Sequence, residues 1–505
     1  MQENLIAEQF TQLKSIIEEI YDLDRAAGVL HWDMQTYMPP GGAEDRGNQL
    51  ATLARLIHRR LTSDETSKLI GEAEKETIGL DPDSDTAREL KKIKREYDKA
   101  VRVPADKVAE FARVRTLAQN AWVKARAESD FKQFQPQLEK IVELRKEYAS
   151  YFAPYDNVYD PLLDDYEPGL KTADVKEIFD NLRPQQVALI KEITARPQVN
   201  DAFLSLEYPE QDQWDFGVDV ITRFGYDWQR GRLDKTAHPF TTSFGHGDVR
   251  LTTRVYPTRF SSALFGTMHE CGHGLYEQNI GRDYRRTALD GPASFAVHES
   301  QSRLWENLVG RSLPFWRYFY PRLQERFKSQ LANVTLNDFY RGINKVQPSY
   351  IRVEADEATY NLHIMLRLEL EIALMDGSLA VRDLPDAWNS HMQDYLGITP
   401  PDDAQGVLQD VHWSGGMIGY FSTYALGNLV SVQIWEKILD DIPDLEGQIT
   451  SGDFSALLDW LRNKVHRFGA KYEPQKLVMQ VTGSKIDPNP YMRYLSNKYG
   501  EIYQI

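Results

Sequence analysis

Three residues within five positions, His269, Glu270 and His273, form an H-E-x-x-H string that could bind a metal ion. Apolar residues such as Phe265 and Leu275 recur around this string at helical spacing, which predicts a helix. Residues four positions apart lie on the same face of a helix, so both imidazoles can reach one metal ion. Glu270 would then project beside the metal, where it can hold a water molecule and remove its proton.

Two histidines leave a tetrahedral metal site one protein ligand short. The metzincin pattern would add a third histidine, but Tyr276 and Asn279 stand where that pattern requires glycine and histidine. Glu277 lies one turn beyond the second histidine, yet three ligands from one helix strip close a tetrahedron badly. A ligand from a second helix fits better, and Glu299 opens the next amphipathic stretch. We therefore predict Glu299 as the third ligand, with His298 and Glu306 as alternatives.

The composition limits the class of protein. The chain has 505 residues, of which 42% are hydrophobic and 27% charged, as in ordinary globular proteins. The 59 basic and 75 acidic residues give a formal charge of −16, which disfavours nucleic acid as a partner. The sequence lacks an apolar run of about 18 residues, so we expect no membrane span. A single cysteine, Cys271, and an N-terminus without a signal-peptide pattern favour the cytoplasm.

The elements that must position the motif are predominantly helical. The first 30 residues place apolar side chains at helical spacing, which predicts an amphipathic helix. The run Pro39–Gly42 then ends the helix, and a second one is expected to begin near Ala43. Segments 105–129 and 131–152 are rich in helix-forming residues. Further breaks are expected at Asp81-Pro82-Asp83, Val103-Pro104 and Ala153-Pro154.

One short part of the chain does not follow the helical pattern. Residues 241–244 and 249–255 are β-branched and alternate in polarity, and Gly245–Asp248 between them contains two glycines. This pattern predicts a β-hairpin within a small β element at about 237–256. Helical periodicity returns from Arg259 onward. We therefore predict a mainly α protein that forms one catalytic unit over 1–505, with helical lobes at roughly 1–230 and 231–505 around a cleft.

Several strings along the chain, in the same order, carry a family resemblance. Taken together they resemble the carboxypeptidase Taq family of metallocarboxypeptidases, over essentially the whole chain and without a departure from its motifs. The strings are Leu30–Pro39, His238-Pro239-Phe240, Asp248–Thr252, His269–His273, His298-Glu299-Ser300-Gln301, Ile351–Asp356 and Gly406–Trp413.

The resemblance implies a large helical peptidase with a deep central groove and a metal held by two histidines and one glutamate. It also implies removal of C-terminal amino acids from peptides, and a homodimer. The metal is expected to be zinc, one ion per chain, although cobalt or manganese suit the same ligands. Glu270 would act as general base towards a metal-activated water and then as acid towards the leaving amine.

A second hydrogen-bond donor usually helps a metal to stabilise the developing oxyanion. The resemblance favours His412 in this role, and Tyr420 and Tyr424 are candidates just downstream. For each tyrosine the alternative is core packing with a satisfied hydroxyl group. Gln409 and Asp410 are expected to shape the wall of the site.

A carboxypeptidase must recognise a free carboxylate, and a guanidinium group suits this bidentately. Arg352 is the predicted anchor, with an intrahelical pair to Asp356 as the alternative. Arg250 on the hairpin is second, although it could simply bond to Asp248. His238 could bind the substrate backbone or cap the hairpin, and both possibilities stay open.

Two other functions are compatible with these residues. One is a metal-dependent oligopeptidase that cuts internal bonds in a helical channel. The other is a helical peptide-binding protein without turnover, although the presence of Glu270 argues against it because a binder needs no base.

Overall fold

The computed structural model describes residues 8–505. Its N-terminal half is helical, with breaks where the sequence predicts them: α1 ends before Pro39, α2 begins at Ala43, and α5 and α6 flank a break at residues 129–134. The part of the first predicted helix before residue 8 lies outside the described residues. The helices are α1 Glu8–Thr36, α2 Ala43–Leu61, α3 Asp64–Glu76, α4 Asp85–Arg102, α5 Ala105–Glu128, α6 Gln135–Ser150, α7 Asp160–Asp164, α8 Thr172–Thr194 and α9 Glu210–Phe224.

A small sheet follows α9 and confirms the predicted hairpin. Strands β2 (Thr241–Ser243) and β3 (Val249–Thr253) pair antiparallel, and Gly245 in the turn has a φ of 128°, which favours glycine. The sequence did not predict β1 (Gly231–Lys235), which pairs in parallel with β3. Its residues, Gly-Arg-Leu-Asp-Lys, lack the β-branched alternation that marks the other two strands.

Helices resume at α10 and continue to the end of the chain, as predicted. They are α10 Phe260–Gln278, α11 Phe295–Arg303, α12 Leu313–Arg326, α13 Lys328–Leu331, α14 Leu336–Ile343, α15 Tyr360–Asp376, α16 Leu384–Leu396, α17 Ser422–Asp441, α18 Leu445–Ser451, α19 Ser455–Lys464, α20 Pro474–Thr482 and α21 Asn489–Tyr503. A short π-helix, η5 (Leu304–Val309), directly extends α11. The prediction of a mainly α fold with a small β element is therefore confirmed.

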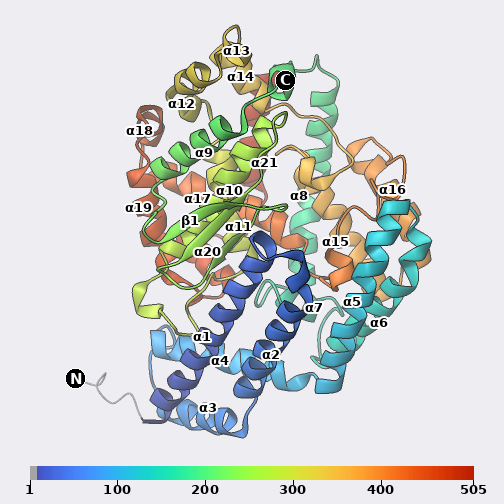
Figure 1. Ribbon diagram of the computed structural model, residues 1–505, viewed down its shortest axis with the longest axis vertical. Coiled ribbons are helices and arrows are strands. Elements are labelled where there is room, and N and C mark those ends of the chain that lie inside the picture. The colour runs from blue at the N-terminus through green and yellow to red at the C-terminus, as the bar shows by residue number, and fades with distance from the viewer. Residues whose placement is uncertain (1–7) are drawn as a thin grey trace.

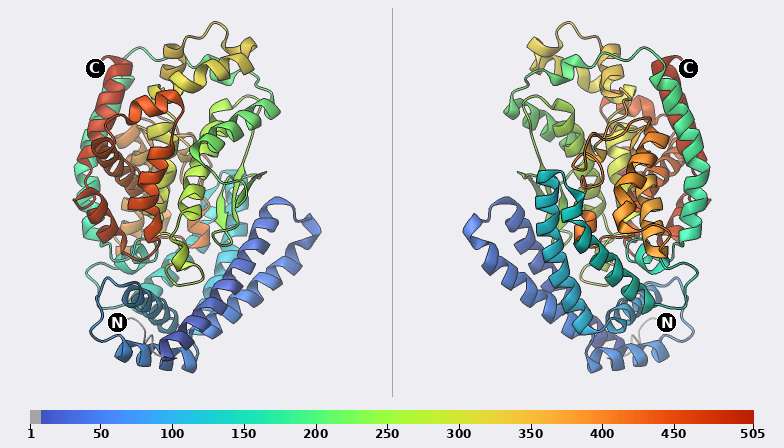
Figure 2. Two further views of the ribbon diagram at one scale, coloured as in Figure 1. Left: turned by 90° about the vertical axis from the view of Figure 1, so that its left-hand side faces the viewer. Right: turned by 90° about the vertical axis from the view of Figure 1, so that its right-hand side faces the viewer.

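The helices are arranged around α10 and α11, which lie near the centre of the molecule (Figure 1). The N-terminal helices α1 to α4 form one end, and the hairpin of α1 and α2 projects from the rest in the side views (Figure 2). None of the helices within residues 8–505 is both long and apolar enough to cross a lipid bilayer.

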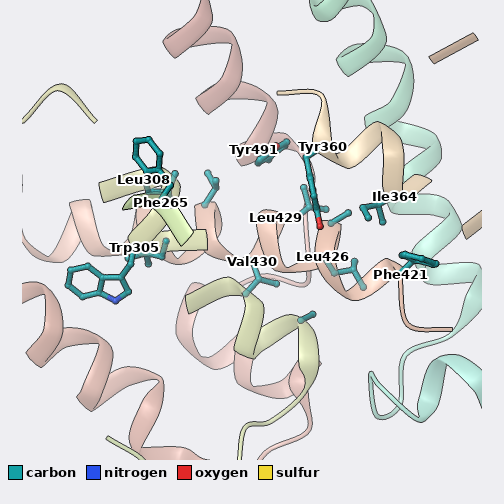
Figure 3. Close-up of a cluster of buried hydrophobic side chains, with 14 of the residues drawn as sticks. Phe265, Trp305, Leu308, Tyr360, Ile364, Phe421, Leu426, Leu429, Val430 and Tyr491 are labelled. Carbon is teal, nitrogen blue, oxygen red and sulfur yellow. The ribbon is translucent and has the colours of Figure 1, made fainter. Parts of the chain in front are cut away.

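One large hydrophobic core holds the central helices in place and extends from Val114 to Tyr503. Figure 3 shows part of it, where side chains from α10, η5, α15, α17 and α21 meet. A smaller core joins α1, α3 and α4 and includes Phe10, Leu69 and Ile93. The large core includes residues on both sides of position 230, so the two predicted lobes share it. The lobes and the deep groove stay predictions.

Candidate metal centre

Two glycines allow the helices of the site to approach closely. A Cβ atom at Gly272 of α10 would lie 2.6 Å from the carbonyl oxygen of Gln301 and 2.6 Å from Cα of Ser302. Glycine at this position therefore lets α10 contact α11 backbone to backbone. A Cβ atom at Gly427 of α17 would likewise lie 2.6 Å from Cγ of Glu299. The glycines thus leave room for the Glu299 side chain beside the H-E-x-x-H helix.

His269, His273 and Glu299 come together as the sequence predicts. The Oε2 atom of Glu299 lies 3.5 Å from Nε2 of His269 and 3.4 Å from Nε2 of His273. The three ligand atoms all lie within 4.8 Å of one another. Ligand atoms about 2.0–2.1 Å from a tetrahedral ion are roughly 3.4 Å apart. The donor set therefore has the chemistry and the spacing to hold a divalent cation.

A second layer of charged side chains orients these ligands. The Nδ1 atom of His269 lies 2.9 Å from Oε2 of Glu306, so Nδ1 carries the proton and Nε2 is left to bind a metal. Arg303 donates to Glu299 over 2.7 Å through Nε and to Glu306 over 3.2 Å through a terminal nitrogen. Glu306 comes from the π-helix, a form of helix that is frequent at functional sites.

Glu299 and His273 are held in the protonation states that a metal requires, whereas burial is outweighed at His269 by Glu299 and Glu306, which raise its pKa. Burial opposes ionisation of Glu299, but Arg303 and the two histidines outweigh it and hold its pKa well below the ordinary value. Burial, helped by the nearby His298, lowers the pKa of His273 to about 3. An ionised carboxylate and a neutral imidazole are the ligand forms of these groups.

The alternative ligands His298 and Glu277 pair with each other instead. Nε2 of His298 lies 3.1 Å from Oε1 of Glu277. The His298 ring stacks on His273, with ring centroids 4.3 Å apart. His298 therefore supports a ligand from the side and is not part of the group of three ligand atoms.

Glu270 is held between the motif helix and the small sheet. The hydroxyl of Thr241 on β2 donates to Oε2 of Glu270 over 2.7 Å. Burial raises the pKa of Glu270 above its ordinary value. The sequence pattern predicted Glu270 as a candidate base but did not indicate Thr241. The only sequence feature that could have indicated Thr241 is its position at the start of the predicted hairpin.

His412, Tyr420 and Tyr424 form one aromatic cluster. The rings of His412 and Tyr420 stack with centroids 5.5 Å apart, and the hydroxyl of Tyr424 lies 3.5 Å from Nε2 of His412. Burial, and to a smaller extent the Glu299 carboxylate, raise the pKa of Tyr420 to about 12. Since Tyr424 lies one turn before Gly427, which contacts Glu299, the cluster adjoins the metal ligands.

Arg352 joins this cluster through a buried ion network. Its Nε and one terminal nitrogen donate to Oδ1 of Asp410 over 3.1 and 2.8 Å, and the other donates to the Tyr360 hydroxyl over 2.8 Å. Its guanidinium carbon lies 5.0 Å from the ring centroid of Tyr424. The alternative pair with Asp356 does not form, because Arg352 lies in a short 3₁₀ turn, Arg352–Glu354, and not in an α-helix.

Arg367 of α15 completes the network, and sequence reasoning missed it. It is fully buried and donates to Oδ2 of Asp410 over 2.7 Å and to Gln409 over 2.8 Å. Burial opposes ionisation of Asp410, but Arg352 and Arg367 lower its pKa far below the ordinary value. The only sequence feature that could have indicated a role for Arg367 is the presence of an arginine inside an apolar helix. Two cations sharing one carboxylate leave a net positive charge beside His412.

The other two predicted binding residues are not among the groups that contact this cluster in residues 8–505. Arg250 bonds to Asp248 over 2.8 and 2.7 Å, and its guanidinium carbon lies 4.3 Å from the ring centroid of Trp32. It therefore links the sheet to α1. His238 is exposed between β1 and β2. Their roles in substrate binding stay predictions.

A mainly helical fold with an H-E-x-x-H helix and a carboxylate from the following helix defines a metallopeptidase. Residues 12–499 match the model of the carboxypeptidase Taq (M32) metallopeptidase family, and the chain belongs to this family. It is thus a metallocarboxypeptidase, a hydrolase that releases C-terminal amino acids from peptides.

Similar proteins cover almost the whole chain. Thermostable carboxypeptidase 1 of Thermus thermophilus is 42% identical over 482 residues, covering 94% of each chain. Carboxypeptidase 1 of Bacillus subtilis is 39% identical over 489 residues, covering 97% of each. The crystal structure of an M32 carboxypeptidase from Deinococcus radiodurans R1 superposes with a TM-score of 0.96 at 40% identity, covering 99% of this chain and 100% of that one. These relatives give no support to the oligopeptidase or the non-catalytic alternative.

Proposed function

We propose that this carboxypeptidase uses one zinc ion per chain, held by His269, His273 and Glu299. The observation that carries the proposal is the convergence of their ligand atoms, with distances of 3.4 and 3.5 Å to one carboxylate oxygen. The Glu306 carboxylate on the far side of the His269 ring supports it. Cobalt and manganese suit the same ligands, so the identity of the metal depends on its availability as well.

Glu270 is the proposed general base. A divalent ion bound here would activate a water molecule and polarise the scissile carbonyl group. One oxygen of Glu270 is held by Thr241, and the other can accept the proton of the attacking water. Because burial raises the pKa of Glu270, the protonated carboxyl can persist long enough to transfer its proton to the leaving amine.

His412, Tyr420 and Tyr424 are the proposed donors to the oxyanion. Burial lowers the pKa of His412 to about 4, so its imidazole is neutral and carries one N–H donor. Burial also keeps both tyrosine hydroxyl groups protonated at neutral pH. All three can therefore donate a hydrogen bond without a change of charge.

Arg352 is the proposed anchor for the C-terminal carboxylate of peptide substrates. A guanidinium group has five N–H donors, and three of those on Arg352 bond to Asp410 and Tyr360. The two remaining donors sit on the two terminal nitrogens, the arrangement that binds a carboxylate bidentately. Arg250, His238 and Tyr420 are proposed to contact the substrate elsewhere.

We also propose that residues 1–505 form a single catalytic unit that acts as a cytoplasmic homodimer. The large hydrophobic core, which extends from Val114 to Tyr503 across both predicted lobes, supports the single unit. The dimer follows from the family resemblance alone. The only cysteine, Cys271, is buried, which is compatible with a reducing compartment.

The test of the metal site is the metal content of Glu299→Ala. The wild type should hold one equivalent of metal and regain activity with zinc, cobalt or manganese after chelation. Glu299→Ala should lose both metal and activity while its circular dichroism is unchanged. Glu325→Ala, an exposed change on α12, is the control and should retain both. If Glu299→Ala keeps a full equivalent of metal, the third ligand is another residue, with Glu277 and His298 next to be tested.

A further inference from the structure

Glu371 of α15 is a completely buried carboxylate, and it forms no ion pair with any residue between positions 8 and 505. Burying an unpaired carboxylate is unfavourable unless several hydrogen bonds stabilise it. The metal site and the Arg352 network do not include it. The hydrogen-bond partners of Glu371 should therefore show why a buried carboxylate is present at this position.

Three donors from two distant parts of the chain converge on this carboxylate. The Tyr159 hydroxyl donates to Oε2 over 2.6 Å, the indole nitrogen of Trp413 donates to Oε1 over 2.8 Å, and the backbone nitrogen of Gly419 donates to Oε2 over 3.0 Å. Trp413 directly follows His412, and Gly419 directly precedes Tyr420. One carboxylate thus binds the loop 412–420 at both ends.

The same loop is pressed against the N-terminal half of the molecule. Gly419 has a φ of 102°, and a Cβ atom there would lie 2.5 Å from the carbonyl oxygen of Leu162 in α7. Tyr159 immediately precedes α7. The backbone of the loop is therefore held in one conformation, by α7 on one side and by Glu371 on the other.

His412 has few bonds of its own that could hold it in place. Its Nδ1 atom has no hydrogen-bond partner within the described chain, and its contact with the Tyr424 hydroxyl is long, at 3.5 Å. The ring packs against Phe421 and Tyr420, with centroids 4.5 and 5.5 Å apart, and its Nδ1 lies 3.8 Å from Oδ1 of Asp410. Because none of these contacts is a short hydrogen bond, the backbone beside the ring must contribute to its position. Trp413 is the nearest residue with a strong buried bond, and that bond leads to Glu371.

We propose that Glu371 is a positioning residue, which fixes the loop 412–420 so that His412 points at the scissile bond. The inference rests on the proposed role of His412. A carboxylate is required because its two oxygens accept all three donors, whereas a glutamine would turn an N–H group towards at least one of them. Burial raises the pKa of Glu371 to about 7. The three hydrogen-bond donors oppose this rise, because they stabilise the ionised carboxylate.

The test compares Glu371→Gln in two backgrounds. A displacement of catalytic groups by about 1 Å costs up to roughly 100-fold in rate, so kcat should fall about 10- to 100-fold while KM and metal content stay nearly constant. In a His412→Ala background the same change should cost less than about threefold, because the group it positions is absent. Glu369→Gln, two residues earlier on α15 and paired with Arg183, is the matched control and should leave kcat unchanged.

Trp413→Phe removes one donor and keeps the carboxylate, so it extends the test if Glu371→Gln does not fold. Its kcat should fall by about three- to tenfold, and this loss should also disappear in the His412→Ala background. Losses that are equal in both backgrounds would mean a purely structural role and overturn the proposal. If His412→Ala alone keeps the wild-type kcat, the proposed role of His412 is wrong and the positioning role is overturned with it.

Discussion

Replacing Arg352 should separate recognition of the substrate C-terminus, its proposed role, from the chemistry at the metal. Two of its five N–H donors have no partner among residues 8–505, so a bound carboxylate would gain up to two charge-assisted hydrogen bonds. Hydrogen bonds to charged groups contribute about 1.5–3 kcal/mol. Losing one such bond should lower kcat/KM by roughly one to two orders of magnitude, which is the smallest loss expected of Arg352→Ala.

The folded state should survive this change. In Arg352→Ala the buried Asp410 keeps its bonds to Arg367, so its charge remains paired. Arg352→Lys preserves the charge but not the bidentate geometry, and its kcat/KM should fall between those of the wild type and Arg352→Ala. Thermal unfolding of both variants shows whether a loss of activity reflects a loss of structure.

The assay is a timed digest of one peptide that ends in a free acid or in an amide, followed by mass spectrometry. The wild type should strongly prefer the acid, and Arg352→Ala should lose most of that preference. A preference that persists in Arg352→Ala but disappears in Arg250→Ala would move the anchor to the sheet. Equal cleavage of acid and amide by the wild type would refute carboxylate recognition itself.

Three other changes test separate parts of the site. Glu270→Gln should reduce turnover by about 10²- to 10⁴-fold without loss of metal, and activity within a few-fold of the wild type would exclude it as the base. Glu306→Gln should weaken metal binding about 10- to 100-fold in chelator competition, since it alters the partner of His269; unchanged affinity would contradict an orienting role. Burial lowers the pKa of His466 to about 3, so the unfolded chain takes up a proton that the folded protein does not. The free energy of unfolding should therefore fall by up to about 1.4 kcal/mol per pH unit as the pH drops from 6.5 towards 3, and urea titrations of His466→Gln should show a smaller slope.

Local patterns were sufficient to predict most of the fold. Proline and glycine runs marked helix ends such as the one before Ala43, and β-branched alternation marked β2 and β3. Strand β1 could not be predicted in this way, because its polar residues become a strand only through pairing with β3. Pairing between distant segments is a tertiary effect that no local window contains.

The candidate metal ligands could be predicted for a similar reason: two are four residues apart on one helix, and the third is on the next helix. The groups that orient them were harder to foresee. Glu306 was predicted as an alternative ligand, but the π-helix turns its carboxylate to the outer nitrogen of His269. Arg367 gave no signal beyond being charged, since its role depends on Asp410, which is 43 residues away in the sequence.

The two halves of the site carry opposite charge, and we expect this separation to set the direction in which a peptide binds. On the metal side, the carboxylates Glu270, Glu299 and Glu306 outnumber the guanidinium groups of Arg303 and Arg311. On the other side, two guanidinium groups share one carboxylate, and the imidazole between the halves is neutral. A divalent cation is expected to bind in the first half and a terminal carboxylate in the second. A bond one residue from the free C-terminus would then lie between them, whereas a peptide bound in reverse would place its ammonium group against the arginines.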